Sequence, residues 1–155
     1  IRRVLGQEIE GSLQDSIEMA ICTLDERNGT VLLASAMRPV WHMATDRWAE
    51  LPASRMPVGG SQHGDKQFQL RVLDLQAGET LYLFSDGLQD QFGTGTDAAT
   101  PPRKWGRKSL QEHLLRLHEQ PLAERMPALE HAYTAWRGTQ PQTDDVLYIA
   151  HEYRG

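Results

Sequence analysis

Acidic residues at the ends of two apolar runs are the side chains of this sequence best suited to chemistry. Asp86 comes shortly after the run Leu81–Phe84, and Asp144 and Asp145 directly precede the run Val146–Ala150. Short runs rich in branched and aromatic residues are typical of buried strands. A carboxylate at the end of such a strand is held rigidly, so the pattern suggests one oxygen-rich site assembled from distant segments.

Two neighbours of Asp86 add to this pattern. Gly87 allows backbone or ligand to approach closely, and Asp90 shares a face with Asp86 if the chain turns helical there. Two carboxylates about 4 Å apart repel by roughly 4 kcal/mol at an effective dielectric of about 20. A cluster of such acids must therefore protonate, stay hydrated or bind a cation. Oxygen donors favour a hard cation, Mg²⁺ or Mn²⁺.

A purely structural interpretation of the same residues stays open. Asp86 and Gly87 are common turn residues, and Asp144 and Asp145 would then be a hydrated strand start. Two further residues are weaker candidates: Asp15, in the turn before the first expected strand, could reach a metal ion. Arg38, beside Pro39 at a strand junction, could bind phosphate or be an ordinary surface charge.

Other chemistries fit the sequence less well. His113 and His118 are five residues apart and lie off a shared helix face, which disfavours a histidine-ligated zinc ion. The sequence Ser85–Gly87 lacks the Gly-x-Ser-x-Gly pattern of serine hydrolases. Cys22 lies in an apolar run, where a structural thiol is the simpler interpretation. No P-loop lysine follows the glycines of 56–62, which we interpret as a turn or a loop close to the site.

The overall composition narrows the class of protein. A chain of 155 residues is long enough for one domain with a proper core. Its net charge of -5 and pI of about 5.6 argue against a nucleic-acid binder. The single cysteine excludes an internal disulfide and favours a reducing cytoplasmic setting. We expect no membrane contact by this segment, because no apolar run reaches membrane-spanning length.

The elements that must position the acids are predicted to be an antiparallel meander followed by two helices. Residues 1–10 have a helical spacing of apolar side chains. Strands are expected at 17–24, 30–36, 39–43, 48–51, 68–73 and 81–84. The sequence Asn28-Gly29 between the first two is a strong hairpin signal, and a turn is expected at Thr45-Asp46.

An exposed loop over residues 93–102 separates this meander from the helices. In the first helix, Ser109 is the expected cap, and the apolar stripe is formed by Leu110, Leu114 and Leu117. The second helix begins near Pro121 and ends at Gly138, with Pro127 able to kink or divide it. Its apolar stripe comprises Leu122, Met126, Leu129, Tyr133 and Trp136. We expect both stripes to pack on a sheet.

The combined pattern resembles the metal-dependent type 2C (PPM) Ser/Thr phosphatases, and most of all their bacterial branch, typified by the stage II sporulation phosphatase E. The resemblance covers essentially the whole chain. Residues 81–87 together with 144–147 resemble the C-terminal metal motifs of these phosphatases. Residues 15–21 resemble the branch's Asp-Gly-Met-Asp-Ile-Ala-Leu, residues 34–39 resemble Ala-Gly-Ala-Asn-Arg-Pro, and residues 56–62 also match.

This resemblance implies an α+β fold: an antiparallel β-sandwich flanked by helices in an α-β-β-α order, with residues 1–155 as the C-terminal portion of a single domain. It implies two Mn²⁺ or Mg²⁺ ions and a third, looser one. Asp86 and Asp144 are the first metal ligands that we infer. The further metal-site residues are Gly87, Asp145, Asp90 and Asp15, and the phosphate-binding residue is Arg38.

The activity that the resemblance implies is hydrolysis of phosphoserine or phosphothreonine by a metal-activated water. The expected substrate is a phosphorylated regulatory protein of the anti-sigma-factor antagonist type. A sensor or receiver domain is expected in the parent chain, and homodimerisation is left open. A non-catalytic module that uses the same fold for partner binding or dimerisation is the alternative function.

The sequence also departs from the family pattern. The family's upstream motif, an Asp followed shortly by Gly-His-Gly, does not occur in these residues. Ser16 and Ser35 replace glycines, and Met37 replaces an asparagine. Two explanations stay open: the chain is a fragment that lacks the N-terminal portion of its domain, or it is a homologue that has lost the motif. Both leave open that this segment is inactive by itself.

Overall fold

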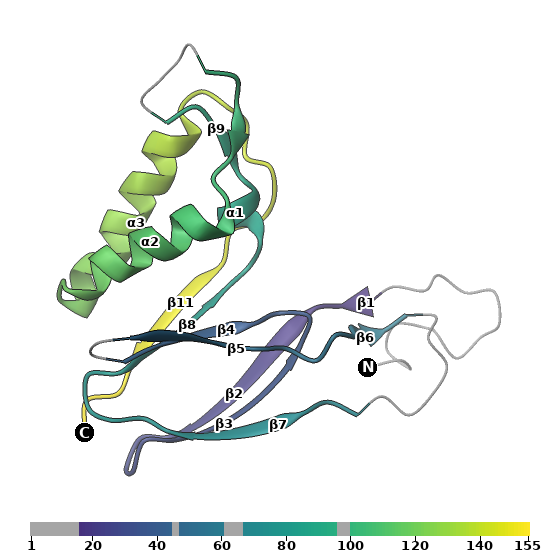
Figure 1. Ribbon diagram of the computed structural model, residues 1–155, viewed down its shortest axis with the longest axis vertical. Helices are drawn as coiled ribbons and strands as arrows, with labels where there is room; N and C mark the ends of the chain where they lie inside the picture. Colours follow the sequence, from purple (N-terminus) through teal and green to yellow (C-terminus); the bar gives the residue numbers. More distant parts are fainter. Residues whose placement is uncertain (1–15, 45–46, 61–66, 96–99) are drawn as a thin grey trace. The chain divides into compact units, whose positions relative to one another are not determined.

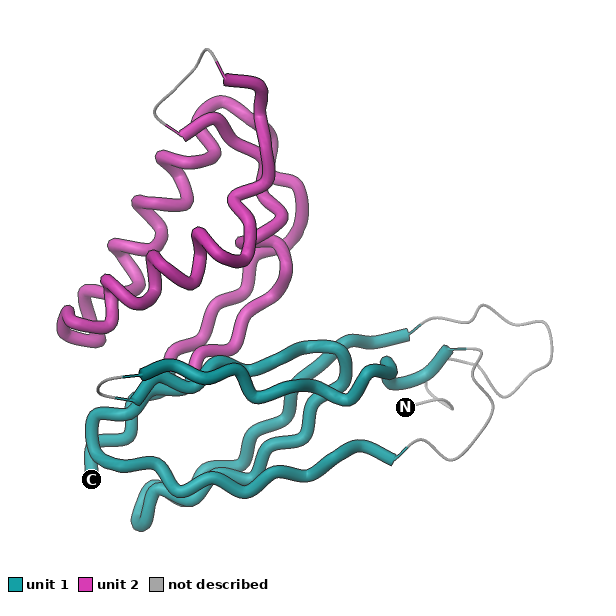
Figure 2. The backbone as a smooth tube through the Cα atoms, in the orientation of Figure 1, with its two compact units in different colours: residues 1–81, 151–155 teal, residues 82–150 magenta. Residues whose placement is uncertain are grey.

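The computed structural model describes residues 16–44, 47–60, 67–95 and 100–155, in two compact units (Figures 1 and 2). Unit 1 comprises residues 1–81 and 151–155, and unit 2 comprises residues 82–150. The expectations for the helix at 1–10, for Asp15 and for the turn at 45–46 lie outside the described residues. Within the described residues, no helix combines the length and apolar character needed to cross a membrane.

Unit 1 is built from antiparallel strands. They are β1 (Ser16–Ile17), β2 (Met19–Asp25), β3 (Thr30–Ala36), β4 (Val40–Met43), β5 (Trp48–Leu51), β6 (Val58–Gly59) and β7 (Leu70–Asp74). A three-stranded sheet has the order β2-β3-β7, while β4 pairs with β5 and β1 with β6. In β3, Val31 and Leu33 are buried and Leu32 is exposed, the alternation expected of a strand with one face on the core. The predicted strands are confirmed, but their meander order is wrong, because β3 pairs with β7 rather than with the next strand, β4.

The β2–β3 hairpin was predicted from Asn28-Gly29, and the hairpin is confirmed with a longer loop. Asp25 pairs with Thr30, so four residues, 26–29, form the loop. Gly29 has a φ of 75° and donates its N–H to the Asp25 carbonyl over 2.9 Å. The Asp25 carboxylate also accepts a bond of 2.9 Å from Arg27 Nε. The loop of residues 26–29 thus forms hydrogen bonds within itself and with Asp25. The Asn28-Gly29 pair alone predicts a hairpin but not this loop length.

The prediction that residues 56–62 form only a loop is wrong at two positions. Val58 and Gly59 form β6, which pairs with Ile17 and Ser16 of β1. Neither strand has the apolar alternation by which a strand is usually found in a sequence. Residues 61 and 62 lie outside the described part of the chain.

Two long-range strands contribute residues to both units. They are β8 (Thr80–Phe84) and β11 (Tyr148–Glu152), neighbours in a sheet of order β11-β8-β4-β5. In unit 1, Tyr153 N–H donates to the Glu79 carbonyl, and in unit 2, Ser85 N–H donates to the Leu147 carbonyl, each over 3.0 Å. These two pairs make β8 and β11 antiparallel. Thr80, Leu81 and Tyr82 are buried, as predicted for a central strand, whereas Leu83 and Phe84 are half-buried.

The last strand begins two residues later than predicted. β11 starts at Tyr148, and Val146 and Leu147 are 39% and 56% exposed. The reason lies in the hydrogen bonding, since Leu147 N–H donates to the Ser85 hydroxyl oxygen rather than to a backbone carbonyl. A side chain therefore replaces one of the two backbone hydrogen bonds of the Ser85–Leu147 pair, and the other remains.

Unit 2 carries the helices. They are α1 (Gly87–Asp90), α2 (Arg107–His118) and α3 (Leu122–Arg137), with a short antiparallel pair of β9 (Phe92–Gly93) and β10 (Arg103–Lys104). The α2 stripe of Leu110, Leu114 and Leu117 is buried as predicted. The cap of α2 is Gly106, with a φ of 83°, so the prediction of Ser109 is wrong by one turn.

Helix α3 runs from Leu122 to Arg137 through Pro127, so of the two expected effects of Pro127, a kink or a division, the division does not occur. Gly138 ends it as predicted, with a φ of 57° and its N–H donating to the Thr134 carbonyl. The prediction of Met126 as a core residue is wrong, because its side chain is 46% exposed.

Arg125 occupies the buried position that Met126 was expected to fill. It is only 5% exposed. Its guanidinium donates to the carbonyls of Gln120, over 2.8 Å, and His118, over 3.0 Å, at the C-terminal end of α2. Such carbonyls lack helical partners and favour a cation. A buried arginine thus joins α2 to α3.

Candidate metal centre

The two acidic segments singled out in the sequence lie against each other in unit 2. Gly87 is buried in α1, and a Cβ atom added to it would overlap the Asp145 carbonyl oxygen. That Cβ would also lie 2.9 Å from the Asp145 carbonyl carbon and 3.2 Å from the Asp144 carbonyl oxygen. The close backbone approach expected at Gly87 is therefore made by the Asp144-Asp145 segment itself.

Ser85 fixes this approach from the neighbouring position. Its hydroxyl donates to the Asp145 carbonyl over 2.7 Å and accepts the Leu147 N–H over 2.9 Å. Together with the bond from Ser85 N–H to the Leu147 carbonyl, three hydrogen bonds join the end of β8 to the segment before β11. The backbones that carry Asp86 and Asp144 thus have a defined register. Sequence reasoning gave Ser85 no such role.

The two principal acids sit at different kinds of backbone position. Asp86 is the N-cap of α1, with no side-chain capping bond, and its carbonyl accepts Asp90 N–H over 2.9 Å. The Asp144 carboxylate accepts Asp145 N–H over 2.7 Å through Oδ1. Asp86 is half-buried, whereas Asp144 and Asp145 are exposed. Solvent and ions therefore have access to the Asp144 and Asp145 side chains.

Asp90 follows Asp86 by one turn of α1, so the helical turn expected after Asp86 is present. Its carboxylate forms an ion pair of 3.0 Å with Lys104 of β10, and the two side chains are 37% and 53% exposed. An exposed pair of this kind is weak, typically about 0–1 kcal/mol. A divalent ion could therefore compete with Lys104 for Asp90.

The donor atoms fit a hard divalent cation, but the ligand set is partial. The backbone carbonyls of Asp144 and Asp145 lie against Gly87, and the same two segments carry the Asp86 and Asp144 carboxylates. Carboxylate and carbonyl oxygens are the ligand types of Mg²⁺ and Mn²⁺. In the part of the chain that the structure describes, no three His, Cys, Asp or Glu side chains converge as a metal-binding group. The arrangement brings two segments of a site together without completing it.

Arg38, the predicted phosphate-binding residue, lies in unit 1. Its guanidinium forms an ion pair of 2.9 Å with Glu18. The preceding residue, Met37, has a φ of 62° and donates its N–H to the Ser54 carbonyl. Asparagine tolerates this left-handed conformation better than methionine does, which explains the asparagine expected at this position. The phosphate-binding role of Arg38 stays a prediction, and Asp15 lies outside the described residues.

Sequence reasoning also missed Gln91, a completely buried polar residue directly after α1. A glutamine within an acidic, Gly-flanked stretch gives no sequence signal for burial, because glutamine is mostly found exposed.

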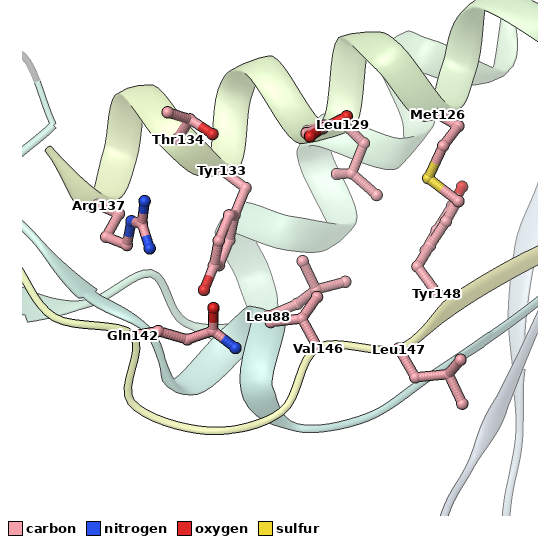
Figure 3. Close-up of a pocket in the computed structure, with 11 residues that line it drawn as sticks. Leu88, Met126, Leu129, Tyr133, Thr134, Arg137, Gln142, Val146, Leu147 and Tyr148 are labelled. Carbon is pink, nitrogen blue, oxygen red and sulfur yellow. The ribbon is translucent and has the colours of Figure 1, made fainter.

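A groove of about 460 Å³ lies between α3 and residues 142–148 (Figure 3). Leu88, Leu129 and Val146 form its apolar centre. Among the described residues, two buried side-chain polar atoms lack a hydrogen-bond partner, the Tyr148 hydroxyl and Arg137 Nε, and both residues line this groove. Burial raises the pKa of Tyr148, so its hydroxyl stays protonated and able to donate.

The chain is similar to known proteins in both sequence and fold. The family model described as stage II sporulation protein E (SpoIIE) matches residues 1–154. A search among curated proteins gave no match.

Among solved structures, the SiaA-PP2C domain of Pseudomonas aeruginosa is 21% identical, with a TM-score of 0.80, over 97% of this chain and 57% of that one. The phosphatase domain of the cell fate determinant SpoIIE from Bacillus subtilis is 14% identical, with a TM-score of 0.59, over 100% and 64%. The RsbU and RsbW domains of Rv1364c from Mycobacterium tuberculosis are 18% identical, with a TM-score of 0.61, over 96% and 38%. The predicted α+β fold of PP2C type is confirmed, and the chain spans less than two thirds of each of these structures.

Proposed function

Because the chain belongs to the SpoIIE family and has the fold of PP2C-type phosphatase domains, we propose that it hydrolyses phosphoserine or phosphothreonine on a regulatory protein. The observation that carries the proposal is the backbone contact of Gly87 with Asp144 and Asp145, which brings two acidic segments to one place. The substrate class that we propose is a phosphorylated anti-sigma-factor antagonist. The reaction would take place in the cytoplasm, under the control of a sensor or receiver domain in the same chain.

The residues proposed to hold Mn²⁺ or Mg²⁺ are first Asp86 and Asp144. Supporting positions in the described unit 2 are Gly87, Asp145 and Asp90, and Asp15 is proposed for a third, looser ion. When bound, the ions would lower the pKa of a water molecule and neutralise phosphoryl oxygens.

The chain's own residues prepare this site in ways that the described contacts support. Ser85 holds the two segments in register through its bonds to Asp145 and Leu147. Gly87 leaves room for the Asp145 carbonyl, since any larger residue would force the segments apart. Arg38 is proposed to bind the substrate phosphate, and it would first have to exchange its Glu18 partner for that phosphate.

We further propose that residues 1–155 are the C-terminal portion of one phosphatase domain. The chain spans 57% of the SiaA-PP2C domain, and the ligand group is incomplete among the described residues. An Asp with a Gly-His-Gly segment, encoded ahead of Ile1, would then supply the missing ligands.

Phosphate release from a phosphoserine protein tests the proposal directly. Purified full-length protein should release phosphate with Mn²⁺ and lose this activity with EDTA. Asp144→Asn should reduce the rate by more than the roughly 10- to 100-fold that loss of an outer-shell partner costs. Asp74→Asn is the matched control, because Asp74 lies in β7 of unit 1 and its carboxylate accepts a bond from the Thr30 hydroxyl. Equal activity of the Asp144 variant and the wild type would contradict the proposed role.

The second candidate function is a non-catalytic module that binds a partner or a second copy of itself. The observation in its favour is the groove along α3, which combines an apolar centre with two buried, unpartnered polar atoms. The residues encoded ahead of Ile1 discriminate between the two functions. An Asp with Gly-His-Gly there favours the phosphatase, and a divergent segment favours the binding module.

A further inference from the structure

Gln91 uses its entire side-chain amide in hydrogen bonds. Its Nε2 donates to the carbonyls of Phe92 and Pro141, each over 2.9 Å. Its Oε1 accepts the Tyr133 hydroxyl over 2.8 Å and Thr143 N–H over 3.1 Å. A glutamine amide offers two donors and one oxygen with two lone pairs, so its capacity is filled. The side chain is also completely buried.

These bonds join three separate parts of unit 2. Phe92 belongs to β9, Tyr133 to α3, and Pro141 and Thr143 to the segment that leads into Asp144. The Gln91 carbonyl adds two more links, because it accepts Trp105 N–H over 2.9 Å and Trp136 Nε1–H over 3.0 Å. Figure 3 shows Tyr133 reaching from α3 toward the segment that carries Gln142.

The position of Gln91 in the chain connects this network to the acids. It directly follows Asp90, the last residue of α1, and Asp86 caps the same short helix. Its partner Thr143 directly precedes Asp144. One buried amide thus ties the end of the helix that carries one principal acid to the residue beside the other.

We propose that Gln91 is a positioning residue that fixes the Asp144 segment against α1 and thereby sets the affinity of the centre for its divalent ion. This inference rests on the proposed phosphatase function. Gln91 would act through Asp144 and not by touching the ion or the substrate. No other side chain of this length both donates two hydrogen bonds and accepts two, so neither Glu nor Leu can replace it.

A purely structural role would give a different result from a positioning role. Loss of a merely stabilising side chain lowers the melting temperature and the folded fraction, while the folded molecules bind Mn²⁺ as before. Loss of a positioning residue weakens Mn²⁺ binding by the folded molecules. The phosphatase activity that is lost at low Mn²⁺ concentration then returns when Mn²⁺ is in excess.

The test compares full-length wild type with Gln91→Glu and Gln91→Leu. Gln91→Glu keeps the acceptors but cannot donate to Phe92 and Pro141. Gln120→Leu is the matched control, since Gln120 is exposed between α2 and α3. The readouts are the Mn²⁺ dissociation constant, from the electron paramagnetic resonance signal of free Mn²⁺, and the Mn²⁺ concentration for half-maximal phosphate release. We expect both values to rise about 10- to 100-fold in the Gln91 variants, as for outer-shell partners in other metal sites, and to stay unchanged in Gln120→Leu.

A milder variant keeps the test decisive if the Gln91 variants fail to fold. Tyr133→Phe removes one of the two donors to Gln91 Oε1 and should raise the Mn²⁺ dissociation constant by a smaller factor. Wild-type Mn²⁺ affinity in folded Gln91→Leu, or in Tyr133→Phe where Gln91→Leu does not fold, overturns the positioning role alone. A wild-type protein that neither binds Mn²⁺ nor releases phosphate overturns the proposed function, and this inference with it.

Discussion

Gly87 and Asp145 are in backbone contact, so close that a single methyl group on Gly87 would overlap the Asp145 carbonyl oxygen. Gly87 does not need glycine for its backbone conformation, because it lies in a helix without a positive φ. It needs glycine because another segment of the chain occupies the space of a side chain. This contact is the physical link between the two halves of the candidate metal centre.

Replacing Gly87 by alanine should therefore damage the centre although alanine is the better helix former. Steric overlap with the Asp144-Asp145 backbone should cost about 1–3 kcal/mol of unfolding free energy, as overpacking typically does. It should also weaken Mn²⁺ binding, because the two segments must separate. Urea unfolding and a Mn²⁺ titration of the full-length protein measure the two effects.

Gly78→Ala is the matched control for this variant. Gly78 has a φ of 90°, and among the described residues no atom beyond its two chain neighbours lies within 4 Å of an added Cβ. Alanine there should cost about 1–2 kcal/mol of backbone strain without changing Mn²⁺ affinity. If both variants bind Mn²⁺ like the wild type, the contact at Gly87 has no part in metal binding.

Ser85→Ala should destabilise unit 2 by removing the hydroxyl between Asp145 and Leu147. The Asp145 carbonyl and the Leu147 N–H each lose a partner, at 2.7 and 2.9 Å. A typical hydrogen bond contributes about 0.5–1.5 kcal/mol net, and because Asp145 and Leu147 are exposed the loss should fall at the lower end. Ser109→Ala, at a half-buried position of α2, is the control and should not destabilise the protein, because alanine is the better helix former. If the Ser85 variant is as stable as the control, the two hydrogen bonds of the Ser85 hydroxyl contribute nothing to stability.

The sequence predicted what depends on repeating patterns and on strand ends. The strands of the meander and the α2 stripe follow from alternation and helical spacing, and both were found. The contact of the Asp86-Gly87 segment with the Asp144-Asp145 segment was predictable, because each segment lies beside the end of an apolar run. The two runs form β8 and β11, which are neighbours in one sheet although they are far apart in the sequence.

Single polar residues in the interior were not predictable in this way. Gln91 and Arg125 are buried because particular carbonyls need donors, namely those of Phe92 and Pro141 for Gln91 and those of His118 and Gln120 for Arg125. Those needs arise only once the helices and loops are in place. For the same reason Met126 was assigned to the core in place of Arg125. The start of β11 was misplaced because Ser85, a side chain far away in sequence, takes over its first hydrogen bond.

Met37→Asn should stabilise unit 1. Met37 has a φ of 62° and is 43% exposed, so it combines backbone strain with little buried surface. Left-handed conformation costs roughly 1–2 kcal/mol per residue, and asparagine relieves part of this cost. We expect a gain of about 0.5–1 kcal/mol, measured by urea unfolding. Met126→Asn, at an exposed position of α3, is the control and should lower the free energy of unfolding by about 0.5 kcal/mol through its poorer helix propensity. If Met37→Asn also lowers the free energy of unfolding, the backbone at Met37 is not strained.

The stability of the protein should depend on the protonation of His113. Burial, and then the charge of Arg116, lower the pKa of His113 from its ordinary value of 6.5. Its ring also packs edge-on against Trp105, with the centroids 5.7 Å apart. Below pH 6.5 the unfolded chain binds a proton more readily than the folded chain, so this contribution to stability is lost as the pH falls from 6.5.

Urea midpoints on either side of pH 6.5 measure this effect. The drop in stability on acidification should be smaller in His113→Gln than in the wild type. His131→Gln is the control, because His131 is exposed on α3, and its drop should match that of the wild type. An unchanged drop in His113→Gln would assign the acid sensitivity to other groups.

A double-mutant cycle on Mn²⁺ binding tests the central claim, that Asp86 and Asp144 serve one metal centre. The Mn²⁺ dissociation constant of the full-length protein is measured for the wild type, Asp86→Asn, Asp144→Asn and the double variant. Residues that share a ligand couple strongly, by about 0.5–3 kcal/mol, whereas independent residues more than about 7–10 Å apart add within about 0.5 kcal/mol. We predict that each single change removes most of the binding and that the double change adds little. Fully additive losses, or unchanged Mn²⁺ affinity in either single variant, would contradict a shared centre.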